Sequence, residues 1–189
     1  MAIKILIDQG HNPSGSPNSG AVGNGIYESE VNYEVGIYLQ NMLNSDGRFE
    51  ARVSRPTPTT VLGYDNNSSL AARVNMANNW PADYFVSVHC NANVSPAING
   101  TEIYIYEYNT QANWLAFDVL NGITRTVGTR DNGIRTNPGL YILRRTNMPT
   151  ILVELGYVTN PSDAIKLRDN TCQFAFGIYI GLIEYFGFM

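Results

Sequence analysis

The stretch Tyr84-Phe85-Val86-Ser87-Val88-His89-Cys90 is an apolar run that only Ser87 and His89 interrupt. Its length and its valines predict a buried strand of the kind found inside parallel sheets. Apolar runs at Ile3–Asp8 and at residues 150–154 predict two more buried strands. We therefore expect a sheet at the centre of the fold and interpret the remaining segments around it.

Segments with helical periodicity separate the predicted strands. Val31, Val35 and Leu39 recur on one face of a helix at residues 28–43, as expected for a helix that covers a core. The other predicted helices carry an apolar stripe or a capping signal: one marked by Leu70, Val74 and Ala77 with Ser68 or Ser69 as its cap, one at residues 110–127, one that starts at Asn160-Pro161, and a final one from Cys172. Further strands are predicted at residues 50–54, 102–108 and 139–143. This order predicts one α/β domain over residues 1–189, with a mixed, mostly parallel twisted sheet and helices on both faces.

The composition is typical of a folded protein, and the sequence shows no basic patch that would bind nucleic acid. Of the 189 residues, 44 % are hydrophobic and 15 % are charged, and the net charge is −4. No run of Lys or Arg stands out beyond the adjacent pair Arg144 and Arg145. Cys90 and Cys172 are expected to be buried free thiols, although a disulfide between them is compatible with the sequence.

Neither end of the chain predicts a signal segment or a membrane span. The apolar stretch that follows Met1 is too short for a signal-peptide core. The stretch from Cys172 to Met189 is nearly long enough to cross a membrane, but Gln173 and Glu184 interrupt it. We expect this stretch to form a buried terminal helix.

Ionisable side chains stand at the ends of three predicted strands. His11 closes the segment Asp8-Gln9-Gly10-His11 after the first strand, His89 lies at the end of the central run, and Glu154 ends the strand at residues 150–154. Ligands of open α/β sheets bind beyond the carboxyl ends of the strands, so these groups would converge if the strands are neighbours. A single histidine at a strand end is more often a hydrogen-bonded structural residue, but here both histidines of the chain occupy such ends.

Glu28 is a fourth candidate because it falls on the apolar stripe of its helix. The helix dipole alone favours a carboxylate in the first turn, but a carboxylate that faces inward is costly unless it is paired or bound to a cation. Two histidines and one carboxylate, with a fourth position left open, are the ligand set of a catalytic zinc site. His11, Glu28 and His89 are therefore the candidate ligands of one zinc ion.

Glu154 is the candidate for proton transfer beside that metal. It would take a proton from the attacking water and deliver it to the leaving amine. The alternative interpretation is a structural ion pair between Glu154 and Arg144 or Arg145.

The segments that carry these residues resemble the zinc-dependent N-acetylmuramoyl-L-alanine amidases of bacterial autolysins and phage endolysins. The resemblance covers nearly the whole chain, in the segments Ile5–His11, Tyr27–Asn32, Leu70–Asn78, Phe85–Ala92, Leu140–Thr146 and Met148–Asn160. These segments are similar to the family's Asp-Pro-Gly-His strand end, its Glu-Lys-x-x-Asn helix start, its Leu-x-x-Arg-x-x-x-Ala-Asn helix, its Phe-Ile-Ser-Ile-His-Ala-Asn-Ala strand and its last signature. The resemblance implies that Glu28 is the metal carboxylate and that Glu154 is the catalytic glutamate.

The resemblance also implies a function. The chain would be a peptidoglycan hydrolase that cleaves the amide bond between N-acetylmuramic acid and the L-alanine of the stem peptide by zinc-activated water. Its partner would be peptidoglycan, and it would act outside the cell or in the cell wall.

Three positions depart from the family pattern without removing a ligand. Gln9 stands where the family usually has Pro, Asn12 stands where it often has Gly, and Cys90 replaces a small Ala. The Cys90 thiol should point away from the metal, because neighbouring residues of a strand face opposite sides of the sheet.

Two other functions stay open from the residues alone. A zinc carboxypeptidase or aminopeptidase would use the same ligand set, although no Arg or acidic pocket for a terminal charge is recognisable. A non-catalytic peptidoglycan-binding module would have no need for Glu154.

Overall fold

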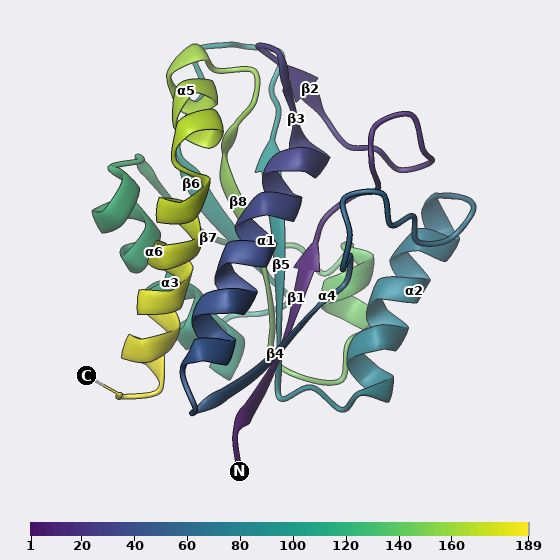
Figure 1. Cartoon of the computed structure of the whole chain (residues 1–189). Coiled ribbons are helices and arrows are strands. Elements are labelled where there is room, and N and C mark those ends of the chain that lie inside the picture. The colour runs from purple at the N-terminus through teal and green to yellow at the C-terminus, as the bar shows by residue number, and fades with distance from the viewer. Residues whose placement is uncertain (189) are drawn as a thin grey trace.

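A six-stranded sheet in the order β4-β1-β5-β8-β6-β7 runs through the computed structural model, which describes residues 1–188 (Figure 1). Its strands are β1 (Ile3–Gln9), β4 (Phe49–Val53), β5 (Tyr84–Asn91), β6 (Thr101–Ile105), β7 (Asp131–Thr136) and β8 (Thr150–Tyr157). Neighbouring strands are parallel except β6 and β8, which are antiparallel. The predicted α/β class with a mixed, mostly parallel sheet is confirmed.

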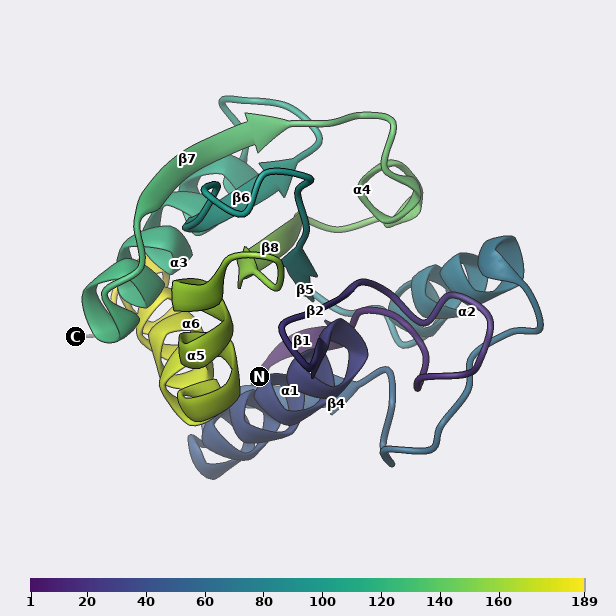
Figure 2. The same cartoon turned by 90° about the horizontal axis from the view of Figure 1, so that it is seen from above.

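Helices cover both faces of this sheet (Figures 1 and 2). The helices α1 (Glu28–Ser45), α3 (Gln111–Val127) and α6 (Thr171–Tyr185) pack on one face, and α2 (Asn66–Asn79) and α4 (Tyr141–Arg145) pack on the other. The helix α5 (Pro161–Asp169) follows β8, and β2 (Val22–Gly23) and β3 (Ile26–Tyr27) form a short hairpin before α1.

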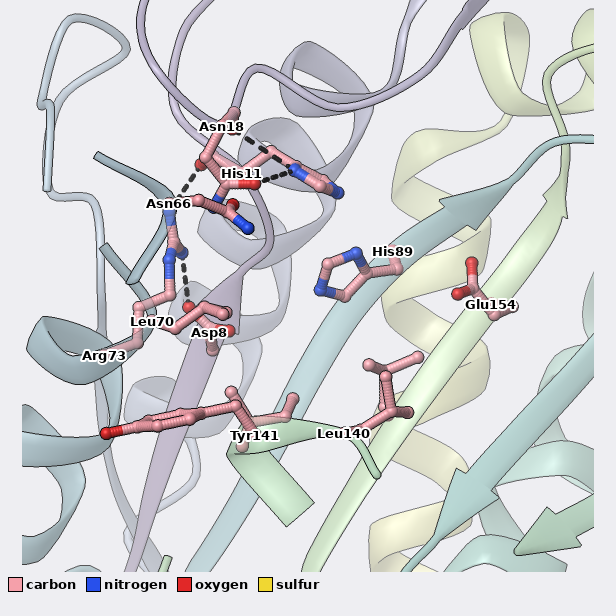
Figure 3. Close-up of a pocket in the computed structure, with 12 residues that line it drawn as sticks. Asp8, His11, Asn18, Asn66, Leu70, Arg73, His89, Leu140, Tyr141 and Glu154 are labelled. Atoms are coloured by element: carbon pink, nitrogen blue, oxygen red, sulfur yellow. Dashed lines mark hydrogen bonds and ion pairs between the residues drawn. The ribbon is translucent and has the colours of Figure 1, made fainter. Parts of the chain in front are cut away.

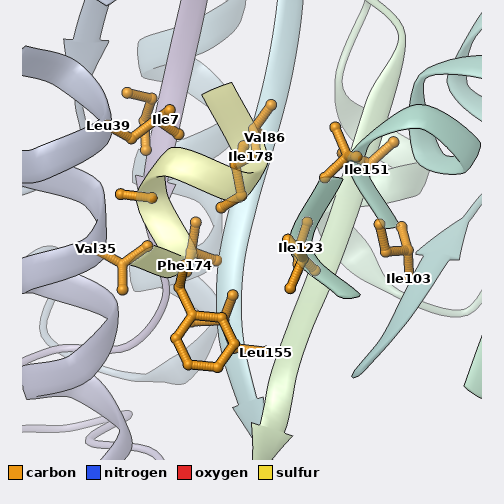
Figure 4. Close-up of a cluster of buried hydrophobic side chains, with 14 of the residues drawn as sticks. Ile7, Val35, Leu39, Val86, Ile103, Ile123, Ile151, Leu155, Phe174 and Ile178 are labelled. Carbon is orange, nitrogen blue, oxygen red and sulfur yellow. The ribbon is translucent and has the colours of Figure 1, made fainter. Parts of the chain in front are cut away.

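The larger apolar core lies between the sheet and α1, α3 and α6 (Figure 4). Ile7 of β1, Val86 of β5 and Leu39 of α1 are completely buried in it. Full burial of each such side chain stabilises the fold by roughly 1.5–3 kcal/mol. A smaller core around Phe85 and Leu152 lies under α2 and α4. The sheet is therefore a rigid base for the groups at its strand ends.

The start of α2 corrects the predicted cap. Asp65, and neither Ser68 nor Ser69, is the N-cap residue: its carboxylate accepts a hydrogen bond from the main-chain N–H of Ser68 at 2.7 Å. The hydroxyl of Ser68 accepts from the main-chain N–H of Asp65 at 3.0 Å, which completes a capping box. The start of α5 matches its prediction, because the Asn160 side chain accepts from two main-chain N–H groups of the first turn.

The strand predicted at residues 139–143 is wrong. Residues Tyr141–Arg145 form the helix α4, and Ile142 and Leu143 pack into the smaller core. A five-residue apolar run carries too little periodicity to separate a strand from a buried helical turn. The edge strand β7 went unrecognised because its polar, partly exposed sequence lacks an apolar face, and the strand expected at residues 102–108 already ends at Ile105.

The predictions for the cysteines are confirmed in part, and the prediction for the C-terminal helix is confirmed. Both cysteines are free, and Cys90 is buried in the larger core, on the sheet face opposite His89, whereas Cys172 is exposed, so its predicted burial is wrong. The helix α6 buries Phe174 and Leu182, which confirms a packed terminal helix; Met189 lies outside the described residues. None of the helices within residues 1–188 combines the length and the hydropathy that a membrane span requires.

Candidate functional site

Three predicted metal ligands meet above the carboxyl ends of the central strands. His11 follows β1, Glu28 is the first residue of α1, and His89 lies near the end of β5. The potential ligand atoms of these three residues all lie within 4.8 Å of one another. The His11 Nε2 atom is 3.1 Å from Glu28 Oε1, and the His89 Nδ1 atom is 2.9 Å from the same oxygen. The structure thus brings together residues that are far apart in the sequence.

Glu28 is buried at the centre of this cluster, with only 3 % of its surface exposed. Its Oε1 atom also accepts from the main-chain N–H of Cys90 at 3.1 Å, and its Oε2 atom accepts from the main-chain N–H of Ala21 at 2.8 Å. Burial would raise the pKa of this carboxyl, but the hydrogen bonds and charges of the two histidines outweigh burial and lower the pKa far below its usual range. The carboxylate is therefore ionised and held in one orientation.

The chemistry of the donor set fits a divalent cation. Both ring nitrogens of His11 face oxygen atoms: Nδ1 lies 2.9 Å from Asn18 Oδ1, and Nε2 faces Glu28. A neutral imidazole has one N–H only, so one of these contacts needs an extra proton or a cation. Burial would lower the pKa of His11, but Glu28 outweighs it and the pKa is raised. Two imidazoles and one carboxylate are ligands that zinc prefers.

Two glycines lie against the cluster, and their lack of a side chain makes room for it. A Cβ atom at Gly10 would collide with the ring of His89, and a Cβ atom at Gly20 would lie 2.8 Å from both Glu28 Oε2 and the His11 ring. Gly20 also has a φ of +81°, in the left-handed region that glycine adopts without strain. Any side chain at these positions would therefore displace a potential ligand.

Glu154 points from β8 toward this cluster, on the same face of the sheet as His89 (Figure 3). Its Oε2 atom is buried without a hydrogen-bond partner in residues 1–188. Burial is the main cause of a pKa well above the usual range, and the charges of Glu28 and Glu102 raise that pKa further. Arg144 and Arg145 are exposed on α4, and within the described part of the chain neither makes an ion pair with Glu154. The ion-pair interpretation of Glu154 is therefore wrong.

A cleft of about 290 Å³ opens beside these groups (Figure 3). His11, His89 and Glu154 line one part of it, and Leu140 and Tyr141 line another part. The ionisable cluster is thus accessible to a molecule that enters the cleft, while Glu28 stays buried behind the histidines.

A buried ion pair beneath the cleft was not recognised from the sequence. Asp8 and Arg73 are each 1 % exposed and their side chains meet at 2.6 Å. Arg73 also donates to the main-chain carbonyl oxygens of Gln9 and His11, both at 2.7 Å. Burial would raise the pKa of Asp8, but Arg73 outweighs burial and the pKa is lowered. The signal was available, because Arg73 lies three residues after Leu70 and thus near the apolar stripe of α2.

A second buried carboxylate, Glu102 of β6, also escaped the sequence analysis. It is 1 % exposed and lies beside Glu154 in the register of β6 and β8. The hydroxyls of Tyr104 and Tyr157 donate to its Oε1 atom at 3.0 and 3.2 Å, and Arg135 lies 3.0 Å from its Oε2 atom. Glu102 thus has two hydroxyl donors and an ion pair with Arg135, whereas the Glu154 Oε2 atom has no hydrogen-bond partner among the residues that the structure describes.

Comparisons with known proteins identify the family of the chain. The sequence profile of the family described as N-acetylmuramoyl-L-alanine amidase matches residues 5–184. The chain is 36 % identical over 190 residues to the N-acetylmuramoyl-L-alanine amidase LytC of Bacillus subtilis, covering 96 % of this chain and 35 % of LytC. It is 36 % identical over 170 residues to the amidase CwlM of Bacillus licheniformis, covering 89 % of this chain and 62 % of CwlM. The chain therefore spans about a third of the length of LytC.

Solved structures show the same fold. An N-acetylmuramoyl-L-alanine amidase from Clostridium difficile 630 superposes with a TM-score of 0.86 at 31 % identity, covering 98 % of this chain and 97 % of that one. The catalytic domain of CwlV from Bacillus (Paenibacillus) polymyxa superposes with a TM-score of 0.84 at 31 % identity, covering 98 % of both chains.

Proposed function

The chain belongs to the N-acetylmuramoyl-L-alanine amidase family, and on that premise we propose that it hydrolyses the amide bond between N-acetylmuramic acid and the L-alanine of the stem peptide in peptidoglycan. We further propose that His11, Glu28 and His89 hold one zinc ion and that Glu154 transfers the proton. The observation that carries the proposal is the meeting of these three potential ligands within 4.8 Å of one another beside Glu154, at the edge of one cleft.

The choice of zinc follows from the ligand types. Imidazole nitrogens and one carboxylate suit zinc better than magnesium or calcium, which prefer oxygen ligands. Bound there, zinc would supply Lewis-acid chemistry by polarising a carbonyl group and lowering the pKa of a water molecule. Three protein ligands leave a fourth position for that chemistry.

Glu154 would act as the base and then as the acid. Its Oε2 atom has no partner of its own, so it is free to take a proton from the attacking water and to return it to the amide nitrogen of the leaving alanine. Burial, Glu28 and Glu102 raise the pKa of Glu154, and a raised pKa makes a carboxylate a better base near neutral pH. A cation beside Glu28 would offset the repulsion from Glu28, which leaves burial and Glu102 as the lasting causes.

The neighbouring residues hold these groups in place. Arg73 ties the main chain at His11 to the buried Asp8, so the first ligand is anchored to β1. The hydrogen bonds to Cys90 and Ala21 fix the Glu28 carboxylate from two sides. The proposed place of action is the bacterial cell wall, as expected for a hydrolase of peptidoglycan.

The test uses purified bacterial walls and the zinc-loaded protein. We expect the turbidity of the walls to fall while new α-amino groups of alanine appear and no free sugar ends form. The Glu154→Gln variant should lose this activity, whereas Glu107→Gln, which changes an exposed glutamate outside the cleft, should keep it.

A parallel assay with free stem peptides as the substrate separates the alternatives. A zinc peptidase would cleave free stem peptides and leave the muramic acid bond intact. A binding module would remain bound to the walls without releasing any amino groups. Either result would overturn the proposed amidase activity.

A further inference from the structure

Asn18 presents two oxygen atoms to one nitrogen of His11. The His11 Nδ1 atom lies 2.9 Å from the side-chain Oδ1 of Asn18 and 3.2 Å from its main-chain oxygen (Figure 3). A main-chain carbonyl can only accept a hydrogen bond, so Nδ1 must carry the proton. The Nε2 atom of the neutral ring is then left with its lone pair, and this atom faces Glu28 at 3.1 Å.

The orientation of the Asn18 amide follows from the same contact. Because His11 Nδ1 is the donor, Asn18 must turn its oxygen toward His11 and its Nδ2 atom away. The Nδ2 atom meets the hydroxyl oxygen of Ser69 at 3.3 Å. Ser69 lies in the first turns of α2 and is completely buried. The helix α2, which also lines the cleft, therefore holds the amide against His11.

Hydrogen bonds within the loop before Gly20 hold Asn18 in this position. The main-chain N–H of Asn12 donates to the Asn18 carbonyl at 2.8 Å. The buried Asn12 side chain donates to the carbonyls of Pro17 and Leu62 and accepts from the N–H of Leu62. Asn18 itself has a φ of +61°, a left-handed conformation that asparagine adopts more readily than most residues. Asn12, one of the departures from the family pattern, thus has a structural role.

From these contacts we propose that Asn18 is the positioning residue of His11: it selects the ring tautomer that leaves Nε2 available and aims that atom at Glu28 and His89. The inference rests on the proposed zinc site. Metal-bound histidines generally donate their second N–H to an oxygen acceptor, and removing that acceptor weakens metal binding roughly 10- to 100-fold.

Three variants test this role. Asn18→Gly removes the side-chain acceptor but tolerates the positive φ, so it adds no backbone strain. Asn18→Asp restores an oxygen acceptor at the same place. Asn109→Gly is the matched control, because Asn109 has the same φ of +61° on an exposed turn away from the cleft. Thermal unfolding of the metal-free proteins checks that each variant is folded.

The main measurement is the zinc dissociation constant, obtained by competition with a chromophoric chelator. Asn18→Gly keeps the longer contact to the main-chain oxygen of residue 18, which is 3.2 Å in the wild type, so we expect it to bind zinc more weakly than the wild type by up to about 10-fold. We expect Asn18→Asp and Asn109→Gly to bind zinc as the wild type does. Nitrogen-15 NMR of the zinc-loaded proteins gives an independent signature: the His11 Nδ1–H signal should be present in the wild type and in Asn18→Asp, and should broaden through exchange with water in Asn18→Gly.

The outcomes distinguish a failure of the role of Asn18 from a failure of the proposed zinc site on which that role rests. Equal zinc affinity of Asn18→Gly and the wild type would overturn the role of Asn18 while leaving the metal site intact. Equal weakening in Asn18→Gly and Asn109→Gly, or in Asn18→Gly and Asn18→Asp, would also overturn that role. Equal affinity of the wild type and His89→Ala would overturn the zinc site, and the role of Asn18 with it.

Discussion

His89 and Glu154 are register partners on the neighbouring parallel strands β5 and β8. Side chains that are paired in this way leave a sheet on the same face, so the proposed ligand and the proposed base stand side by side at one edge. Phe85 and Leu152, which precede them by an even number of residues, point to the same face and fill the smaller core below. The sheet register thus sets the separation between metal site and base.

Replacement of the base should separate binding from turnover. Glu154→Gln keeps the shape of the side chain but cannot exchange a proton, so we expect zinc affinity to stay within a few-fold of the wild type. Wall hydrolysis should fall roughly 10²- to 10⁴-fold, the usual contribution of a general acid–base residue. Metal analysis together with the turbidity assay checks both parts, and wild-type hydrolysis by this variant would remove Glu154 from the mechanism.

The same substitution should change the pH dependence of stability in the metal-free protein. The pKa of Glu154 is raised in the folded state by burial, Glu28 and Glu102, so above the unfolded pKa of about 4.3 the folded protein binds more protons than the unfolded one. Stability should therefore fall as pH rises through this window, by up to about 1.4 kcal/mol per pH unit.

Urea unfolding at several pH values measures this effect as the difference between wild type and Glu154→Gln. The variant lacks the titrating group, so its free energy of unfolding should not fall in this way. The free energy of unfolding of Glu154→Gln minus that of the wild type should therefore increase with pH between about 4 and the folded pKa of Glu154. A constant difference across that range would show that Glu154 does not hold its proton.

Zinc should stabilise the folded protein in a concentration-dependent way. A ligand that binds only the folded state at 100 times its dissociation constant adds about 2.7 kcal/mol, so the melting temperature should rise with zinc and fall back with chelator. In His89→Ala, which lacks one ligand, this rise should be lost.

Acid should oppose zinc binding, because only the neutral imidazole is a ligand. Although burial would lower the pKa of His11, Glu28 raises it in the metal-free protein, so protons should begin to compete above the ordinary histidine pKa of about 6.5. Zinc affinity measured from pH 8 down to pH 6 should decrease steadily. A pH-independent affinity would argue that the histidines are not the ligands.

Gly15 and Gly20, which both have a positive φ, provide a matched pair of substitutions in the segment between β1 and β2. Gly20→Ala and Gly15→Ala both force alanine into a left-handed conformation, with φ of +81° and +83°, at a cost of about 1–2 kcal/mol each. A Cβ atom at Gly20 also meets Glu28 and His11, whereas a Cβ atom at Gly15 meets no atom within 4 Å. We expect only Gly20→Ala to weaken zinc binding, by at least about 10-fold, in the chelator competition assay.

The buried ion pair under the cleft should matter more than its exposed counterpart. Arg73→Met leaves the Asp8 carboxylate buried without its partner, and we expect the free energy of unfolding to fall by about 3–5 kcal/mol. Arg168→Met removes the exposed pair with Asp169 and should leave stability nearly unchanged, because solvent screens exposed ion pairs. Chemical denaturation of both variants makes the comparison, and equal losses would contradict the structural role of Arg73.

The sequence by itself determined the class of the fold and the chemical types at the site. Two local properties of the sequence predicted a helix and a central strand before any contact was known. These are the helical spacing of Val31, Val35 and Leu39 and the mainly apolar run at Tyr84–Cys90. The same local order placed His11, His89 and Glu154 at strand ends and Glu28 at the start of a helix. These predictions succeeded because secondary structure depends mainly on near neighbours in the chain.

Only the tertiary structure decided how these groups meet. Whether both histidines approach one oxygen of Glu28, whether Asn18 selects the tautomer of His11, and whether Glu154 lacks a partner depend on loops and register that join residues tens of positions apart. The mistaken strand at residues 139–143 and the unrecognised β7 have the same origin, since a short segment takes the conformation that its packing partners stabilise. Contacts of this range leave no periodic trace in the sequence, because their energies come from atoms brought together by the folded chain.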